Sequence, residues 1–371
     1  MAKVKLGEVA REYKATVKDA VDLPVVGLEH LIPGQVELTQ WSEDADNTFT
    51  KGFKKGQMLF GRRRAYLKKA ALAPFDGICS GDITVIEAIP ERIMPELLPF
   101  VIQNDCLFDY AVEKSAGSLS PRVKWEHLKN YEFELPEMEH QRELVDLLWA
   151  MTRTKKAYQE LLKKTDELVK SQFIEMFGNM SEIITTSKTT TLGAVCDIRD
   201  GTHDTPKYCD EGYPLVTSKN VTAGYLDFSS CNLISKEDYD KIQKRSHVDC
   251  GDIIMPMIGT VGKPVIVETD REFAIKNVAL IKFIPNSKVT NVFVKYLLES
   301  DYFDRTVMEK VQGGNQKFIA LGDLRGLPLV IPSFIDQERF GSVVEQSDKS
   351  KFELTQAISR IDDMIKTLMQ G

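Results

Sequence analysis

A run of basic side chains is the feature of this sequence with the most direct chemical meaning. Residues 51–75 contain eight Lys and Arg and no Asp or Glu, although the whole chain has a formal net charge of −7. The eight are Lys51, Lys54, Lys55, Arg62, Arg63, Arg64, Lys68 and Lys69. Such side chains neutralise phosphate groups, and an Arg fork can bond guanine O6 and N7 in the major groove. The run therefore predicts a nucleic-acid contact; a solvated basic surface without a partner is the alternative.

The candidate DNA contacts extend beyond this run. In the first half of the chain they are Arg62, Arg63, Arg64, Tyr66, Lys68, Lys69, Arg122 and Lys124. In the second half they are Lys219, Asn220, Lys263, Lys276, Asn277, Asn315, Gln316 and Lys317. Asn and Gln can pair with adenine through two hydrogen bonds, but they are equally common as caps in loops and turns. The second half thus offers fewer charges and a weaker signal.

Three patterns that could indicate an enzyme lack essential parts. The stretch IGTVGKP at 258–264 is not a phosphate-binding loop, because Pro264 stands where that loop needs a Ser or Thr hydroxyl. We find neither the glycine-rich cofactor loop nor the Asn-Pro-Pro-Tyr motif of a methyltransferase that flips its target base. His203 and Asp204 are neighbours without a nucleophile or clustered carboxylates, and a loop turn explains them. We therefore predict no catalytic residue.

Composition places the chain among ordinary globular proteins. It has 371 residues, of which 43% are hydrophobic and 28% charged, and this length favours two or more domains. The six cysteines show no C-x-x-C spacing and no clustering with histidine, so neither a metal site nor a disulfide is predicted. No apolar run is long enough for a membrane span or resembles a signal peptide, which predicts a cytoplasmic protein.

The two halves of the chain repeat one pattern. Five segments of the first half align with five of the second in the same order, at offsets that rise from 186 to 196. The pairs are 5–10 with 191–196, 23–31 with 213–221, 54–66 with 249–261, 77–86 with 272–281, and 124–142 with 320–338. Identities are few, but the common order favours an internal duplication over chance. Short Val-, Ile- and Phe-rich runs between Gly, Pro and Asp predict a strand-rich domain with some helix in each copy.

Each copy closes with a long amphipathic helix, predicted over residues 136–178 and 335–370. Apolar residues recur there mainly at steps of three and four with charges between, which is the pattern of coiled-coil partners. The seam residues are Leu144, Leu148, Met151, Tyr158, Leu162 and Val169 in the first helix, and Val344, Leu354, Ile358, Ile361 and Ile365 in the second. We expect antiparallel packing of the two helices; the alternative is that each folds onto its own domain. An antiparallel pair would relate the domains by a pseudo-twofold axis, which suits duplex DNA.

Several long phrases of the sequence are typical of one protein family. In the first half they are LFGRRRAYLKKAA, FDGICSGDITV and SPRVKWEHLKNYEFELPEMEHQRELV. FIEMFGN, at the end of the first long helical segment, is another. In the second half they are DGTHDTPKYCDEGYPLVTSKNV, IGTVGKPVIV, FAIKNVALIKF and VQGGNQKFIALGDLRGLPLVIP. In these phrases the chain resembles a specificity subunit of a type I restriction-modification system, over nearly its whole length. Some members of that family carry a further helical segment first, whereas this sequence starts directly with the first recognition domain.

The resemblance implies an α+β fold with two mixed α/β target recognition domains, separated by two long antiparallel helices that form a coiled coil. The domains would be residues 1–135 and 179–331, and the conserved helical regions 136–178 and 332–371. The chain would recognise a bipartite duplex DNA target and position two methyltransferase subunits and the restriction subunits on it. It would not be an enzyme and would hold no cofactor, because S-adenosylmethionine, ATP and Mg²⁺ belong to the partner subunits.

A dumbbell-shaped protein-interaction scaffold without DNA recognition is the alternative. Duplicated domains on long helices suit either function, so the basic run is what separates the two. Charge reversal of Arg62, Arg63 and Arg64 would lower affinity for DNA and its salt dependence only in the DNA reader.

Overall fold

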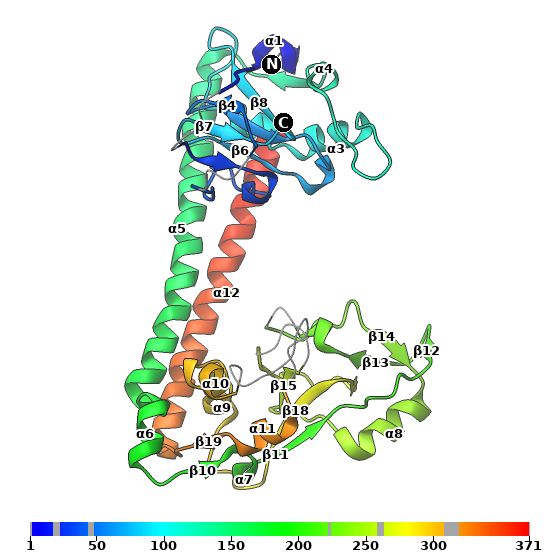
Figure 1. The fold of residues 1–371 in the computed structure, drawn as a ribbon, viewed down its shortest axis with the longest axis vertical. Coiled ribbons are helices and arrows are strands. Elements are labelled where there is room, and N and C mark those ends of the chain that lie inside the picture. The colour runs from blue at the N-terminus through cyan, green and yellow to red at the C-terminus, as the bar shows by residue number, and fades with distance from the viewer. Residues whose placement is uncertain are drawn as a thin grey trace. The chain divides into compact units, whose positions relative to one another are not determined.

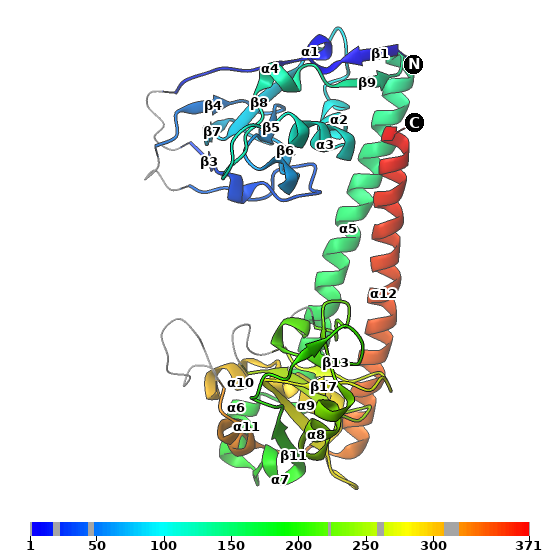
Figure 2. The same ribbon diagram turned by 90° about the vertical axis from the view of Figure 1, so that its right-hand side faces the viewer.

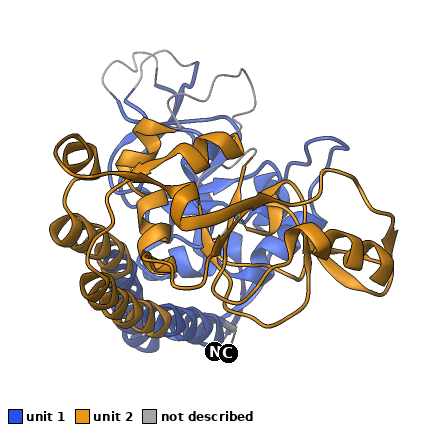
Figure 3. Cartoon of the chain, turned by 90° about the horizontal axis from the view of Figure 1, so that it is seen from below, with its two compact units in different colours: residues 1–160, 354–371 blue, residues 161–353 orange. Residues whose placement is uncertain are grey.

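The computed structural model describes residues 2–17, 23–43, 48–221, 224–257, 263–307 and 319–370. The chain divides into two compact units, residues 1–160 with 354–371 and residues 161–353, shown in different colours in Figure 3. Both units combine helices with short strands, so the predicted mixed α and β fold is confirmed. Among the described residues, no helix is both long and apolar enough to cross a membrane.

The first unit contains two neighbouring sheets. A four-stranded antiparallel sheet has the order β2-β8-β5-β6, and a three-stranded sheet has the order β3-β7-β4, with β3 parallel to β7. The strands are β2 Ala10–Glu12, β3 Val25–Val26, β4 Lys51–Phe53, β5 Met58–Gly61, β6 Ala70–Leu72, β7 Gly77–Cys79 and β8 Ile83–Ala88. The basic run thus supplies β4, β5 and β6 (Figure 2).

Alternation along β5 explains why the larger sheet is buried on both faces. Met58 and Phe60 belong to one apolar cluster, whereas Leu59 between them belongs to another. Successive side chains of a strand point to opposite faces, so each face receives its own core. Helices α2 (Leu98–Ile102) and α3 (Asp105–Glu113) contribute to the cluster of Met58 and therefore cover that face.

A two-stranded antiparallel ribbon connects the sheets of this unit to the first long helix. It pairs β1 (Ala2–Lys5) with β9 (Glu132–Leu135). The remaining elements are α1 Leu6–Val9, η1 Leu28–His30, η2 Ala65–Leu67 and α4 Trp125–Leu128. Gly7 in α1 lies so near α4 that a Cβ there would be 3.0 Å from the Cβ of Lys129, which explains the glycine.

The second unit also contains two sheets. One is antiparallel with the order β11-β18-β15-β16, and the other has the order β12-β14-β13-β17, in which β13 and β17 are parallel. The strands are β11 Cys196–Asp200, β12 Tyr208–Cys209, β13 Tyr213–Val216, β14 Asn232–Ile234, β15 Ile253–Pro256, β16 Val265–Ile266, β17 Ala274–Ile275 and β18 Val278–Phe283. Alternation again gives two cores, since Ile253 and Met255 join one cluster and Ile254 another.

Short helices complete the second unit. They are α6 Met180–Thr186, α7 Leu192–Val195, η3 Ser218–Asn220, α8 Lys236–Ser246, α9 Asn291–Leu298, α10 Asp301–Thr306 and α11 Leu321–Gly326, with β10 Thr190–Thr191 paired to β19 Pro328–Leu329. Ser235 is the N-cap of α8, and its hydroxyl accepts a hydrogen bond from Asp238 N. The last turn of α8 contains Lys244 and Arg245, cations that suit the negative end of the helix dipole.

Two long helices lie where the sequence predicts them. They are α5 (Met138–Phe177) and α12 (Phe334–Gln370) (Figure 1). Helix α5 ends before Gly178, whose φ of +76° is the left-handed conformation that glycine adopts without strain. Within the first unit both helices pack on one apolar cluster, through residues such as Leu144 and Ile365, and within the second unit both join another.

The predicted seam residues are shielded from solvent. All eleven, from Leu144 to Ile365, are buried or partly buried. In the first unit Lys155 Nζ lies 2.5 Å from Asp362 Oδ1, and in the second Lys351 Nζ lies 3.1 Å from Asp166 Oδ1. Each ion pair joins a residue of α5 to one of α12, so the helices contact each other in both units. Each helix also packs on the apolar core of both units, whereas the alternative expected each helix on its own domain alone.

Candidate nucleic-acid interface

The fold supplies internal partners for part of the basic run. The partners are Asp76 for Lys54, Asp105 for Lys68, and the carbonyl oxygens of Ile83 and Leu28 for Lys51 and Lys69, at 2.6 to 2.8 Å. Two of the predicted DNA contacts, Lys68 and Lys69, are thus engaged within the first unit. The run offers less charge to an outside partner than its sequence suggests, because its acidic partners lie outside residues 51–75.

Arg63 of the run and Arg122, which lies outside it, meet at one carboxylate. Arg122 donates to Asp82 from Nε at 2.7 Å and from Nη2 at 3.2 Å. Arg63 reaches the same carboxylate from Nη1 at 3.5 Å and donates from Nη2 to Ser120 Oγ at 3.1 Å. The structure therefore brings together two predicted DNA contacts that are 59 positions apart in the sequence. Asp82 is a central residue of this group that sequence reasoning missed.

Backbone hydrogen bonds hold this arginine group in place. Arg62 N donates to Asp82 O at 2.9 Å, and Val123 N donates to Arg62 O at 3.0 Å. Arg64 N donates to Pro121 O at 2.8 Å. Because backbone hydrogen bonds join these chain segments, the Cα atoms that carry the guanidinium side chains have fixed positions. Such preorganisation is what a recognition surface requires.

Asp82 remains ionised within this group. The Arg122 hydrogen bond is the main reason that the pKa of Asp82 lies below its ordinary value, and the charges of Arg122, Arg63 and Arg62 act in the same direction. Partial burial opposes them without prevailing. Two arginines thus bond one carboxylate and Arg62 acts on it through its charge, so the group keeps a net positive charge that suits a phosphate backbone or a guanine edge.

The turn after the arginines is presented to solvent. Arg64 and Lys68 flank η2, and both have left-handed backbones, with φ of 53° and 51°. Non-glycine residues adopt this conformation at a cost of about 1–2 kcal/mol, so the turn has a specific shape. Arg64 is exposed, and the Tyr66 side chain is 53% exposed. Lys124, just before α4, is also exposed. These three side chains can reach a partner without rearrangement.

The second unit presents a more polar group of candidates. Lys219 and Lys263 are exposed. The Lys276 ammonium donates to the Thr205 hydroxyl, and Asn277 Oδ1 lies 3.1 Å from His203 Nδ1. Asn277 has a φ of 55°, a conformation that Asn tolerates better than most residues. The predicted contacts Asn315, Gln316 and Lys317 lie outside the described residues.

Asn220 is a correction to the predicted contacts. Its side chain is only 4% exposed and caps the turn that contains η3. Oδ1 accepts from the N–H and hydroxyl of Thr217, at 2.9 Å each, and Nδ2 donates to Asp227 O and Ser230 Oγ at 3.2 Å. An amide whose donors and acceptor are all used internally cannot also read a base. The prediction that Asn220 contacts DNA was therefore wrong.

The side chain of His203 pairs with Asp200 rather than with Asp204, its neighbour in the sequence. Its Nε2 lies 2.7 Å from Asp200 Oδ2, and the guanidinium of Arg245 at the end of α8 bonds Oδ1 of the same carboxylate. Burial favours the neutral form of Asp200, but the bonds from His203 and Arg245 outweigh it and lower its pKa. Only the i to i+3 spacing of residues 200 and 203 could have indicated this pair, whereas Arg245 is brought in by tertiary structure.

Replacing Asp200 by Asn is expected to destabilise the second unit by about 1–3 kcal/mol at pH 7, because it leaves the groups of Arg245 and His203 poorly paired. The pKa of Asp200 is lowered on folding, so its ionised form stabilises the fold above its ordinary pKa of 3.8, and this contribution is lost as the pH falls through the folded-state pKa. Urea unfolding between pH 7 and pH 3 should therefore show a steeper loss for the native chain than for Asp200→Asn. Identical pH dependence of the two proteins would contradict this role.

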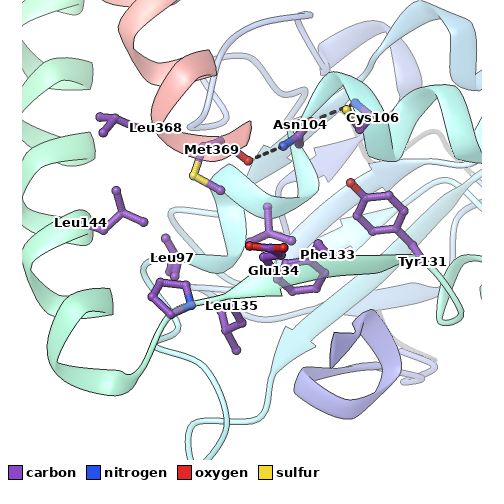
Figure 4. A pocket seen from close by; sticks show the side chains of 12 residues that line it. Leu97, Asn104, Cys106, Tyr131, Phe133, Glu134, Leu135, Leu144, Leu368 and Met369 are labelled. Atoms are coloured by element: carbon purple, nitrogen blue, oxygen red, sulfur yellow. Dashed lines mark hydrogen bonds between the residues drawn. The ribbon is translucent and has the colours of Figure 1, made fainter. Parts of the chain in front are cut away.

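A cavity of about 470 Å³ lies elsewhere in the first unit, beside the end of α12. Figure 4 shows Phe133, Leu144 and Leu368 among its largely apolar lining, and Asn104 Nδ2 donates to Met369 O at 3.0 Å. None of the predicted DNA contacts lines it. Across the described ranges, no group of three or more His, Cys, Asp or Glu side chains is placed to hold a metal ion.

Comparison with known proteins connects this architecture to one family. Residues 185–361 match the family model of the type I restriction modification DNA specificity domain. The type I restriction enzyme MjaVIII specificity subunit of Methanocaldococcus jannaschii is 23% identical over 316 residues, or 78% of this chain and 74% of that protein. The EcoBI specificity subunit of Escherichia coli is 25% identical over 164 residues, or 43% of this chain and 34% of that subunit. Both relatives are named as specificity subunits, not as methyltransferases or nucleases.

Two solved structures share the fold over almost the whole chain. The S subunit of a type I restriction-modification system from M. genitalium has a TM-score of 0.59 at 13% identity, covering all of this chain and 95% of that one. A chain from work on assembly and conformational transition of the type I R-M system also has a TM-score of 0.59, at 19% identity, covering 99% and 96%. At these identities the likeness is one of fold.

Proposed function

We propose, on the premise that this chain belongs to the family of type I restriction-modification specificity subunits, that it is the DNA-reading subunit of such a complex. It recognises a bipartite duplex target, with one part of the site read by each half of the chain. The match of residues 185–361 to a DNA specificity domain is the observation that carries this proposal. The arginine group around Asp82 supports a corresponding role for the first half.

Two buried glutamines support an internal duplication. Gln141 lies at the start of α5 and Gln337 at the start of α12, and each is 1% exposed. Each Oε1 accepts from a backbone N–H, at 2.9 and 2.8 Å, and each Nε2 donates to a proline carbonyl oxygen, at 2.8 and 3.1 Å. The partners are Met94 and Pro136 for Gln141, and Thr290 and Pro332 for Gln337. The same capping device at equivalent positions favours common descent of the halves.

The sheets and a close glycine contact support the same inference. The strand order β2-β8-β5-β6 of the first unit has the chain connectivity of β11-β18-β15-β16 in the second. A Cβ on Gly193 would lie 3.0 Å from Arg325 Cβ, the separation that Gly7 would have from Lys129. We therefore assign residues 1–135 and 179–331 as target recognition domains, and 136–178 and 332–371 as conserved helical regions.

We propose further that α5 and α12 form an antiparallel coiled coil. The two ion pairs between them support this register. From the first pair to the second, the residue number rises from Lys155 to Asp166 on α5 and falls by the same amount, from Asp362 to Lys351, on α12. This is the register of antiparallel helices. The partly buried seam residues in between fit a narrow coiled-coil interface. Domains on such a pair would be related by a pseudo-twofold axis, as the two strands of a duplex are.

The chemistry belongs to the partner subunits in this proposal. The chain carries two methyltransferase subunits and the restriction subunits to its target, in the cytoplasm. Adenine methylation and ATP-driven cleavage occur on those subunits with their S-adenosylmethionine, ATP and Mg²⁺, and this chain holds no cofactor. Its contribution is affinity from phosphate contacts and selectivity from base contacts.

Selection of duplexes from a random library by the reconstituted complex tests this function. A specificity subunit should enrich one split motif with a fixed gap, and the same methyltransferase without this chain should enrich none. Equal recovery of all sequences by the complete complex would reject the proposal and favour the scaffold alternative.

A further inference from the structure

We propose that Arg122 reads a guanine in the part of the target bound by the first unit, and that Asp82 is the positioning residue that aims it. This inference rests on the proposed function and makes it specific to one base contact. Within the described part of the first unit, each of the other candidate cations lacks either a carboxylate that fixes the side chain or an unused edge. Arg122 has both.

The two edges of the Arg122 guanidinium are used differently. The Nε and Nη2 edge faces Asp82, with bonds of 2.7 and 3.2 Å to the two carboxylate oxygens. This two-bond arrangement fixes both the plane and the direction of the group. The terminal edge, with Nη1 and the second N–H of Nη2, makes no hydrogen bond to any described residue, and the side chain is 41% exposed. That edge has the fork geometry that matches guanine O6 and N7.

The main chain of Arg122 is fixed as well. Arg122 N donates to Ala116 O at 2.9 Å, and Ala116 N donates to Arg122 O at 3.1 Å. A second bridge pairs Arg122 with Arg63. Base reading needs a donor pair held to within a fraction of an ångström, whereas a phosphate accepts a flexible cation. The rigidity at Arg122 therefore favours a base over a phosphate as its partner.

The neighbouring cations are less suited to this role. Arg63 is 3.5 Å from Asp82, at the limit of a hydrogen bond, and its Nε is buried without a partner among the described residues. Arg64 and Lys124 are exposed, and no described side chain bonds their charged groups. These residues fit the looser geometry of phosphate contacts. The ammonium groups of Lys68 and Lys69 already donate hydrogen bonds within the unit, to Asp105 and to Leu28 O.

Charge alone predicts the opposite effect of removing Asp82. A carboxylate near a polyanion is repelled, so Asp82→Asn should strengthen binding to any duplex if Asp82 acted only through its charge. If Asp82 orients Arg122, the same change should weaken binding to the cognate site alone. The sign of the effect thus separates positioning from simple electrostatics.

The experiment uses the reconstituted complex and the target motif found by library selection. Affinities are measured for the cognate duplex and for duplexes with each guanine of the first unit's half-site replaced. Asp82→Asn and Arg122→Lys should each lower cognate affinity by about 10- to 100-fold, and both should abolish discrimination at the same guanine. Affinity for unrelated duplexes should be unchanged with Arg122→Lys and unchanged or higher with Asp82→Asn.

Asp76→Asn is the matched control. Asp76 also pairs with a cation of the basic run, Lys54 at 2.8 Å, but holds no arginine. It should leave the preference at every position unchanged. Because Arg122→Lys keeps the ion pair with Asp82 while losing the fork, it tests the inference even if Asp82→Asn does not fold.

The outcomes separate this inference from the proposed function. A native complex without any sequence preference rejects both. A native complex that reads its motif supports the proposed function. If the variants then lose cognate and unrelated binding equally, or keep discrimination at every guanine, only the roles of Asp82 and Arg122 are overturned.

Discussion

Reversal of Arg62, Arg63 and Arg64 to Glu is expected to weaken binding of the reconstituted complex to its duplex target by at least about 100-fold. All three follow β5, and the triple change replaces three positive charges of the proposed DNA-binding surface by three negative ones. The slope of log affinity against log salt concentration should become shallower by about 0.9 for each phosphate that the variant no longer neutralises. Equilibrium binding to cognate and unrelated duplexes at several salt concentrations measures both quantities.

The corresponding triple change to Gln is the control for this prediction. It removes the attraction without adding repulsion, so its affinity should lie between those of the native and Glu proteins. Thermal unfolding should confirm that the variants fold, since Arg62 and Arg63 are half-buried. Native affinity and native salt slope in the Glu variant would show that the basic run does not contact DNA.

Truncation of Phe340 to Ala is expected to destabilise the second unit by about 3–5 kcal/mol. Phe340 in α12 is fully buried, and its ring centroid lies 5.4 Å from those of Phe173 and Phe177 in α5 and 5.1 Å from that of Tyr296. Removing the ring leaves a cavity where α12 packs on α5 and on α9. Denaturant unfolding followed by circular dichroism measures the loss.

Phe334→Ala on the same helix is the matched control. Its side chain is 50% exposed, so the substitution should change the free energy of unfolding by no more than about 0.5 kcal/mol. Equal effects of the two substitutions would mean that the aromatic cluster of α5 and α12 does not stabilise this unit.

The local pattern of apolar and polar residues was sufficient to predict the long helices and much of the strand content. The spacing of Leu144, Leu148 and their successors matches the helical period, and Gly178 marks the end of α5. The sequence of β5 shows no alternation of apolar and polar residues, because both faces of the strand are buried and its residues form one apolar run. The proposed internal repeat predicted similar short strands in both halves, but it did not give their order in the sheets.

The partners of charged side chains could not be predicted, because they depend on tertiary structure. Asp82 and Arg122 are 40 residues apart, and only the fold brings their side chains together. The amide of Asn220 could pair with adenine, but it is buried and its hydrogen-bonding groups are used within a turn. The basic run was visible in the sequence, whereas the distinction between the fixed Arg122 and the less constrained arginines of the run required the three-dimensional structure.

Methylome sequencing of cells that carry this chain with the proposed methyltransferase subunits tests the proposed DNA-reading role most directly. The expected result is one split motif with a constant gap, modified at adenine in both parts and absent when this chain is deleted. Methylation that lacks such a motif, or that persists unchanged without this chain, would contradict its role as the specificity subunit.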